Sequence, residues 1–135
     1  MRRIVDAPTV ATLPYSAGVT AAGLCFVAGQ FGTDHEDRPV GDVERQTTLA
    51  IDHLEAVLKR AGTSLDLVVR TTVWLCKLDD FTAMNRAYRV RFPRDPPARV
   101  TVAVAELLFG TAVEIDAIAA MPGADTTRAI ENQEP

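Results

Sequence analysis

Two residues in the C-terminal half of the chain combine reactive groups with an unusual setting, and the first is Arg99. In the stretch "ARVTVAVA" (98–105), alternation places three valines on one face of a predicted strand and Arg99, Thr101 and small alanines on the other. A guanidinium keeps its charge at any physiological pH and presents a rigid fork of N–H donors. An arginine in this setting forms either a salt bridge or the floor of a site for an anionic ligand.

The second residue is Glu114, in the apolar stretch "AVEIDAIAA" (112–120). Alternation puts Glu114 and one further acid on one face and only apolar side chains on the other. A tight turn at Gly110 would pair this strand with the preceding one and bring Glu114 near Thr101 or Arg99. Two interpretations then stay open: a structural ion pair between Arg99 and Glu114, which the usual pairing of buried charges favours, or a ligand site.

Other kinds of chemistry have little support in the sequence. The two histidines, His35 and His53, lack neighbouring ligands at metal-site spacing, and no phosphate-binding loop, dinucleotide fingerprint or nucleophile elbow is present. Cys25 and Cys76 lie in apolar, strand-like runs, where a thiol behaves as a small hydrophobic side chain. The remaining candidates for a site are Arg99, Thr101, Glu114 and Tyr15. We expect their side chains to act alone, without a metal or cofactor.

Length and charge limit the classes of function. The chain has 135 residues, enough for one domain, predicted at 1–121, with a polar tail at 122–135. The formal net charge is -4 and no basic run is present, which argues against a nucleic-acid partner. The sequence shows neither the apolar core of a signal peptide nor a run long enough to span a membrane. We therefore expect a cytoplasmic protein without a membrane partner.

The elements that must hold these residues follow from hydrophobic periodicity. Segments rich in β-branched and apolar residues predict strands, and segments with apolar residues three and four positions apart predict helices. The predicted elements are a strand at 23–30, a helix at 43–61 between the caps Asp42 and Gly62, a strand within 65–78, a helix within 79–92 that Pro93 ends, and strands from 99 and at 112–119.

This order predicts an α+β fold in which two helices pack on one face of a mixed sheet. Two helices cover only one side of such a sheet. The strands at 23–30 and from 99 are nevertheless poor in charge on both faces, and large exposed apolar surfaces are rare on soluble monomers. We therefore expect the second face to be buried against other subunits of an obligate homo-oligomer.

Several motifs, taken together and in order, resemble those of the YjgF/YER057c/UK114 family, also called the RidA family, of enamine/imine deaminases. The resemblance extends from about residue 2 to about residue 120. It rests on "PYS" (14–16), "FVAGQ" (26–30), "TTVWLCKLDDFTAMNRAY" (71–88), "FPRDPPARVTVAVAEL" (92–107) and "GTAVEIDAIA" (110–119). The combination of "PPAR" with "VEI" after a short connection is the most specific of these signatures.

The resemblance implies a chorismate-mutase-like α+β fold that forms a trimer with inward-facing sheets and ligand clefts between neighbouring subunits. It also implies hydrolysis of 2-imino acids, or their enamine tautomers, to 2-oxo acids and ammonia without a cofactor. In this family pattern Arg99 matches the arginine that holds the substrate carboxylate, Glu114 the acid that orients and activates water, and Tyr15 an aromatic hydroxyl that lines the cleft.

Further positions match parts of the family's cleft that contact the substrate. Backbone groups near Gly29 and Phe31 match a substrate-contacting loop, and Phe81 and Asn85 match positions at the cleft rim. Thr101 stands where many members have Cys or Ser. Its hydroxyl can still hydrogen-bond a substrate, whereas any role of a thiol is lost.

Two departures from the family pattern leave the substrate open. The usual "GPYSQA" is "LPYSAG" here, so that Leu13 and Ala17 change the loop that presents Tyr15, and the common "PKG" turn is "LFG", so that Phe109 replaces a cation. A deaminase for small substrates such as 2-iminobutanoate and 2-iminopropanoate is the leading hypothesis. A pathway-specific deaminase for a 2-aminomuconate-like substrate and a regulatory trimer that binds small carboxylates without catalysis are the alternatives.

Overall fold

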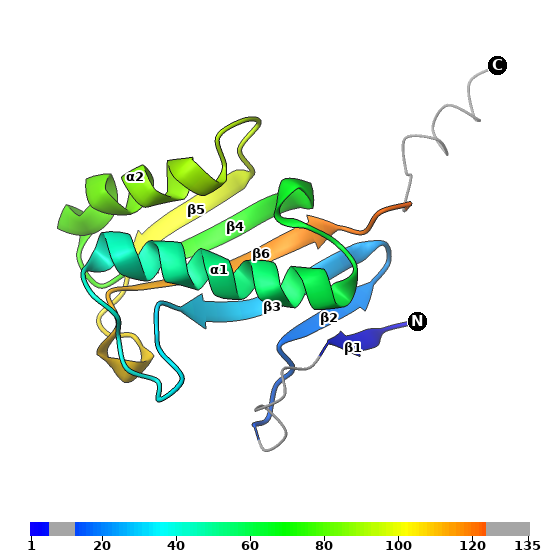
Figure 1. Ribbon diagram of the computed structural model, residues 1–135, viewed down its shortest axis with the longest axis horizontal. Coiled ribbons are helices and arrows are strands. Elements are labelled where there is room, and N and C mark those ends of the chain that lie inside the picture. The colour runs from blue at the N-terminus through cyan, green and yellow to red at the C-terminus, as the bar shows by residue number, and fades with distance from the viewer. Residues whose placement is uncertain (6–12, 124–135) are drawn as a thin grey trace.

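Two helices pack on one face of a six-stranded mixed sheet, which confirms the predicted fold class (Figure 1). The computed structural model describes residues 1–5 and 13–123, so the predicted tail lies, from residue 124 on, outside the described residues. The elements are the strands β1 Arg3–Val5, β2 Gly18–Ala21, β3 Leu24–Phe31, β4 Val68–Leu75, β5 Ala98–Ala103 and β6 Val113–Ala120, and the helices α1 Val43–Ala61 and α2 Phe81–Arg91.

Helix α1 begins and ends where the sequence predicts. The Asp42 carboxylate accepts a hydrogen bond from the Arg45 N–H at 2.9 Å, and Gly62 adopts the left-handed conformation (φ 90°) that terminates the helix. Between these caps the apolar residues form one stripe that packs on β3 and β6. Its fully buried members include Ile51, Leu54 and Leu58.

The strand order is β1-β2-β3-β6-β4-β5, with β4 and β5 parallel to each other. The predicted hairpin of the last two strands is wrong, because β4 lies between β5 and β6. The connection 104–112 instead carries the chain past the end of β4 into the centre of the sheet. The inner face of β6 explains this position, since Val113, Ile115, Ala117 and Ala119 are all buried. Such a strand requires neighbours on both sides, whereas the arginine-bearing β5 suits an edge.

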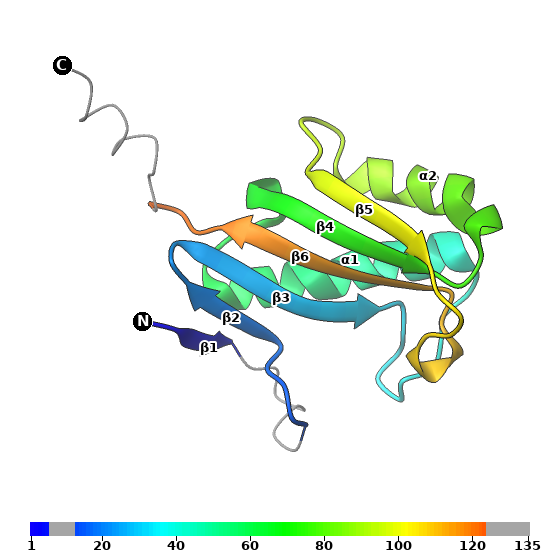
Figure 2. The ribbon, with the colours of Figure 1, turned by 180° about the vertical axis from the view of Figure 1, so that it is seen from behind.

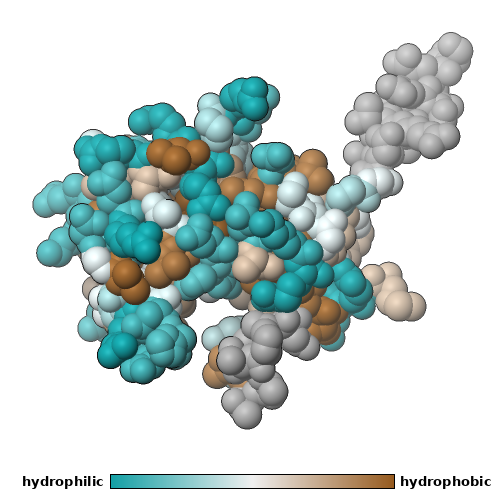
Figure 3. All heavy atoms as spheres, in the orientation of Figure 1, coloured by the Kyte–Doolittle hydropathy of each residue, from teal (hydrophilic) through white to brown (hydrophobic). Residues whose placement is uncertain are grey.

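The opposite face of the sheet is not covered by either described helix (Figure 2). Apolar side chains stay accessible there: Phe26 is 42% exposed and Val102 is 39% exposed. Their cross-strand neighbours on the same face are Ile118 and Trp74. The helix-covered side is mainly hydrophilic with separate hydrophobic spots (Figure 3). The uncovered apolar face is therefore confirmed, while the homo-oligomer inferred from it stays a prediction.

Candidate functional site

Arg99 lies on the edge strand β5 and faces the helix-covered side of the sheet. Its guanidinium carbon lies 4.7 Å from the ring centroid of Tyr88 and 5.6 Å from that of Phe81, both on α2. The Tyr88 hydroxyl is in turn hydrogen-bonded to Oγ1 of the buried Thr71, at 2.7 Å. Cation–π contacts with two rings, one of them anchored to the sheet, therefore hold the Arg99 fork in place.

The charge of Arg99 has no acidic partner in the described part of the chain: none of the carboxylates there lies within salt-bridge distance. The structural ion pair between Arg99 and Glu114 is therefore not formed. By comparison, Arg91 on α2 pairs with both Asp52 and Glu55 on α1. Arg91 thus joins the two helices, whereas Arg99 keeps its charge available for an anion.

A cavity of about 290 Å³ opens beside Arg99, between α2 and the segment that leads into β5. It is lined by Asn85, Tyr88, Arg89, Phe92, Pro96, Pro97 and Arg99. The structure therefore brings Asn85, Phe81 and Arg99 together. Thr101 lies two residues further along the same face of β5, opposite Val73 of β4, and is half-buried.

Glu114 lies at the start of the central strand β6 and faces the uncovered side of the sheet. Its register partners are Phe31 on β3 and Trp74 on β4, so both aromatic side chains share its face. The Gly29 backbone comes so close that a Cβ built on it would lie 1.9 Å from Oε2 of Glu114. Gly29, Phe31 and Glu114 thus come together, and a larger residue at position 29 would displace the carboxylate.

The surroundings of Glu114 raise the pKa of its carboxyl group above the usual value for glutamate. Partial burial, which disfavours the charged form, is the larger cause, and the negative charge of Asp116 on the same face adds to it. Asp116 is fixed by the Thr72 N–H, which donates to its Oδ1 at 2.9 Å. A raised pKa allows a carboxyl group to take up and return a proton more readily at physiological pH.

Arg99 and Glu114 do not share a site within one chain. They lie on opposite faces of the sheet, and β4 separates their strands. The prediction that Glu114 falls near Arg99 or Thr101 is therefore wrong for the single chain. One chain instead presents two half-sites, defined as the Arg99 half-site (Arg99, Phe81, Asn85 and Tyr88) and the Glu114 half-site (Glu114, Gly29, Phe31 and Asp116).

Tyr15 lies at the end of the sheet that carries the Glu114 half-site. Its chain segment runs beside β3, because the Ala28 N–H donates to the Ala17 carbonyl oxygen at 2.9 Å. The Tyr15 side chain is 56% exposed and forms no hydrogen bond with another side chain in the described residues. The role of Tyr15 in a ligand cleft stays a prediction.

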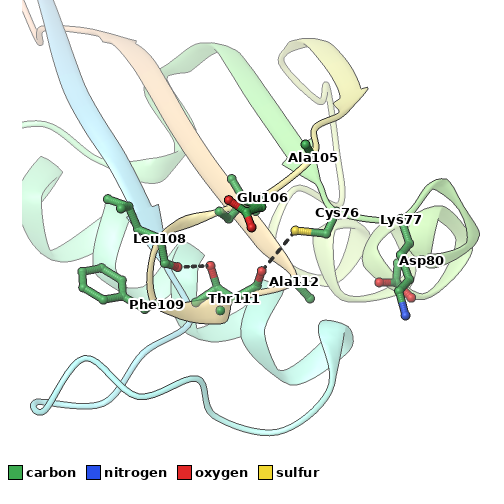
Figure 4. Close-up of a pocket in the computed structure, with 11 residues that line it drawn as sticks. Cys76, Lys77, Asp80, Ala105, Glu106, Leu108, Phe109, Thr111 and Ala112 are labelled. Carbon is green, nitrogen blue, oxygen red and sulfur yellow. Dashed lines mark hydrogen bonds between the residues drawn. The ribbon is translucent and has the colours of Figure 1, made fainter.

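A larger hollow, of about 670 Å³, lies where β4 and β5 end (Figure 4). It is lined by Cys76, Lys77 and Asp80 after β4 and by residues 105–112 of the connection to β6. The Cys76 thiol donates weakly to the Thr111 carbonyl oxygen at 3.4 Å. No sequence pattern predicts this hollow, because it exists only where the connection passes the end of β4.

The sequence predicts no site role for two aromatic residues, Tyr88 of the Arg99 half-site and Phe109 beside the Glu114 half-site. Tyr88 has the spacing of a core residue of α2 and is indeed buried, but its ring also holds Arg99. The spacing of Phe81, Asn85 and Tyr88, at i, i+4 and i+7, is a signal that could have placed all three beside the same ligand. Phe109 packs on Phe31, with 5.4 Å between the ring centroids, and no local pattern predicts that contact.

Within residues 1–5 and 13–123, no group of three or more His, Cys, Asp or Glu side chains is placed to hold a metal ion. His53 Nδ1 lies 2.9 Å from the Phe31 carbonyl oxygen, where it supports the end of β3. Cys25 is buried, and both it and Cys76 are free thiols. Neither described helix is both long enough and apolar enough to cross a membrane.

The sequence and fold are shared with known proteins. A sequence profile described as Endoribonuclease L-PSP matches residues 5–121. A RutC family protein of Pyrococcus abyssi is 41% identical over 108 residues, which cover 78% of this chain and 85% of that protein. The chain therefore belongs to this family, which is also described as the YjgF/YER057c/UK114 family.

Solved structures of relatives have the same architecture. A Thermotoga maritima protein is 36% identical and superposes with a TM-score of 0.83 over 91% of this chain and 100% of that chain. TdcF of E. coli, crystallised with bound serine, is 29% identical and has a TM-score of 0.79 over 87% of this chain and 98% of that chain. The open sheet with two helices on one face is thus the common fold of the family.

Proposed function

We propose that the protein hydrolyses 2-imino acids, or their enamine tautomers, to 2-oxo acids and ammonia in clefts between the subunits of a homotrimer. Each cleft combines the Arg99 half-site of one subunit with the Glu114 half-site of its neighbour. The observation that carries the proposal is that, among the described residues, one half-site holds a cation without an acid and the other an acid without a cation. They lie on opposite faces and can therefore meet only across a subunit boundary.

In the binding step, the Arg99 fork holds the substrate carboxylate. A planar guanidinium donates two parallel hydrogen bonds to a carboxylate, which fixes both the anion and the electrophilic C=N carbon bonded to it. The rings of Phe81 and Tyr88 keep the fork from turning, and Asn85 offers a further polar group in the same cavity. Thr101 offers a hydroxyl two residues further along the same face of β5.

In the chemical step, Glu114 of the partner subunit acts on water. Its carboxylate accepts a proton from water while the water oxygen bonds to the C=N carbon, and it passes this proton to the nitrogen as the C=N double bond becomes single. The resulting carbinolamine then loses ammonia as Glu114 transfers a second proton from oxygen to nitrogen, and the C=O bond forms. Such acid–base catalysis typically contributes about 10²- to 10⁴-fold in rate.

The raised pKa of Glu114 supports this role, because the same group must take up a proton and then release it. The serine bound by TdcF supports a site for small carboxylates, since its carboxylate is the kind of group assigned here to Arg99. RNA cleavage, which the family name Endoribonuclease L-PSP suggests, has less support, because a net charge of -4 opposes the binding of a polyanion.

The proposal is tested by generating 2-iminopropanoate or 2-iminobutanoate in solution and trapping the surviving imine with semicarbazide. We expect the protein to lower the trapped amount, and Glu114→Gln to lower kcat by about 10²- to 10⁴-fold without weakening substrate binding comparably. Unchanged trapping in the presence of excess protein would refute the proposal. Binding of 2-oxobutanoate without any imine turnover would favour the regulatory trimer. Turnover of 2-aminomuconate, but not of the small 2-imino acids, would favour the pathway-specific deaminase.

A further inference from the structure

The connection between β5 and β6 exposes an aromatic side chain from a strained backbone. Phe109, in the 3₁₀ turn Leu108–Gly110, has φ 64° and ψ 8°, in the left-handed region that residues with a Cβ avoid. Phe109 is 46% exposed and Leu108 64% exposed. A strained residue that is not buried in its own chain suggests contact with a ligand or partner rather than a role in the core.

The Phe109 ring is held next to the Glu114 half-site. It packs edge-to-face on Phe31, with the ring planes at 89°. Phe31 is the register partner of Glu114 and shares its face, and Phe109 extends this aromatic surface beyond Phe31. Figure 4 shows Phe109 at the β3 end of the connection, turned away from Cys76. We call Phe31 and Phe109 the aromatic wall.

The chemistry around Glu114 distinguishes between classes of substrate side chain. An aromatic or branched aliphatic group gains free energy when it is buried against the two rings. A second carboxylate would instead approach Glu114 and Asp116, whose like charges repel it. The family's common "PKG" turn places a cation at this position, and such a cation would favour polar or acidic groups that Phe109 does not.

We propose that the aromatic wall binds the side chain of the substrate and that the protein prefers 2-imino acids with aromatic or branched aliphatic side chains over those with small or acidic ones. The inference rests on the proposed function, because the reacting carbon lies next to the wall when it is attacked by the water that Glu114 activates. In this arrangement Arg99 binds the carboxylate, Glu114 lies close to the C=N carbon, and the wall contacts the side chain of the substrate.

The preference is measured with imines that an amino-acid oxidase releases from phenylalanine, leucine, alanine and glutamate, with catalase present to remove peroxide. We expect kcat/KM for the phenylalanine-derived imine to exceed that for the alanine-derived imine by about tenfold or more. Phe109→Ala should remove most of this difference, because it should lower kcat/KM for the phenylalanine-derived imine much more than kcat/KM for the alanine-derived one. Leu108→Ala, on the same exposed turn but outside the wall, is the matched control and should keep the preference.

Equal turnover of the two imines by the unaltered protein would overturn the inference, and so would an equal loss for both imines in Phe109→Ala. A smaller assembly for Phe109→Ala in light scattering would assign the ring to a subunit contact and would also overturn it. Calorimetry with phenylpyruvate and pyruvate separates the two proposals. Tighter binding of phenylpyruvate that depends on Phe109, without imine turnover, would support the wall and refute the proposed reaction.

Discussion

The two half-sites show contrasting ways in which one sheet holds a charge. Arg99 lies at the edge strand, beneath α2, where two aromatic rings enclose it and no described acid neutralises it. Glu114 lies on the central strand and on the uncovered face. There the Gly29 backbone approaches its carboxylate closely, and the negative charge of Asp116 repels it. One position preserves a positive charge, and the other favours the uncharged form of an acid.

This contrast supports the proposal that the functional unit is larger than the chain. A desolvated charge without its counterpart is unfavourable for a folded protein, and each half-site lacks what the other holds. Bringing an edge strand against the uncovered face of a neighbour would bury apolar surface and bring the two charges to a common cleft. A carboxylate ligand between them would then neutralise Arg99 and lie within reach of Glu114.

The largest effect is expected when association of the subunits is prevented. Val102 lies on the uncovered face beside Trp74, and Val102→Asp would place a charge in the expected subunit contact. We expect a folded monomer by circular dichroism and light scattering, with no measurable imine hydrolysis. Val90→Asp is the control, because Val90 is 73% exposed on α2, and it should stay assembled and active. A monomeric Val102→Asp protein with full activity would show that one chain is sufficient.

A smaller effect is expected when the Arg99 half-site keeps its charge but loses its fork. In Arg99→Lys, a point charge replaces the bidentate guanidinium, and the stacking of the guanidinium on the two rings is lost. We expect KM for 2-imino acids to rise about 10- to 100-fold, with a smaller change in kcat. Arg86→Lys, an exposed residue of α2 that pairs with Glu44, is the matched control. An unchanged KM would remove Arg99 from substrate binding.

The smallest effect concerns the acid of the other half-site. Asp116→Asn removes the negative neighbour that helps to raise the pKa of Glu114, while its amide oxygen can still accept from the Thr72 N–H. The pKa of Glu114 should therefore fall, and the acidic limb of the kcat/KM profile should move to lower pH, since the carboxylate form then persists further into acid. The exposed Asp66→Asn is the control. A limb that stays in place or moves to higher pH would contradict Glu114 as the base.

Patterns local in sequence predict the elements well. Asp42 and Gly62 locate the ends of α1, because capping depends on neighbouring backbone groups. Alternation likewise predicts which side chains of β5 and of β6 share a face. Both kinds of information come from residues a few positions apart, so they need no knowledge of the remaining chain.

The relation between the two half-sites depends on contacts distant in sequence. Alternation along one strand does not tell which of its faces matches a given face of another strand, so the opposite orientation of Arg99 and Glu114 was not predictable from it. The short connection through Gly110 favoured a hairpin, whereas the buried inner face of β6 determined its central place. The contacts of Tyr88 and Phe109 arise only once this order is set.

Mixed oligomers of two variants show directly whether each cleft combines residues of two subunits. Arg99→Ala and Glu114→Ala each remove one half-site and should be inactive alone. When both are co-expressed in equal amounts, about a quarter of the wild-type activity should return, because roughly one cleft in four then joins an intact Arg99 to the partner subunit's intact Glu114. A mixture that stays as inactive as its components, while assembling normally, would contradict a cleft built from two subunits.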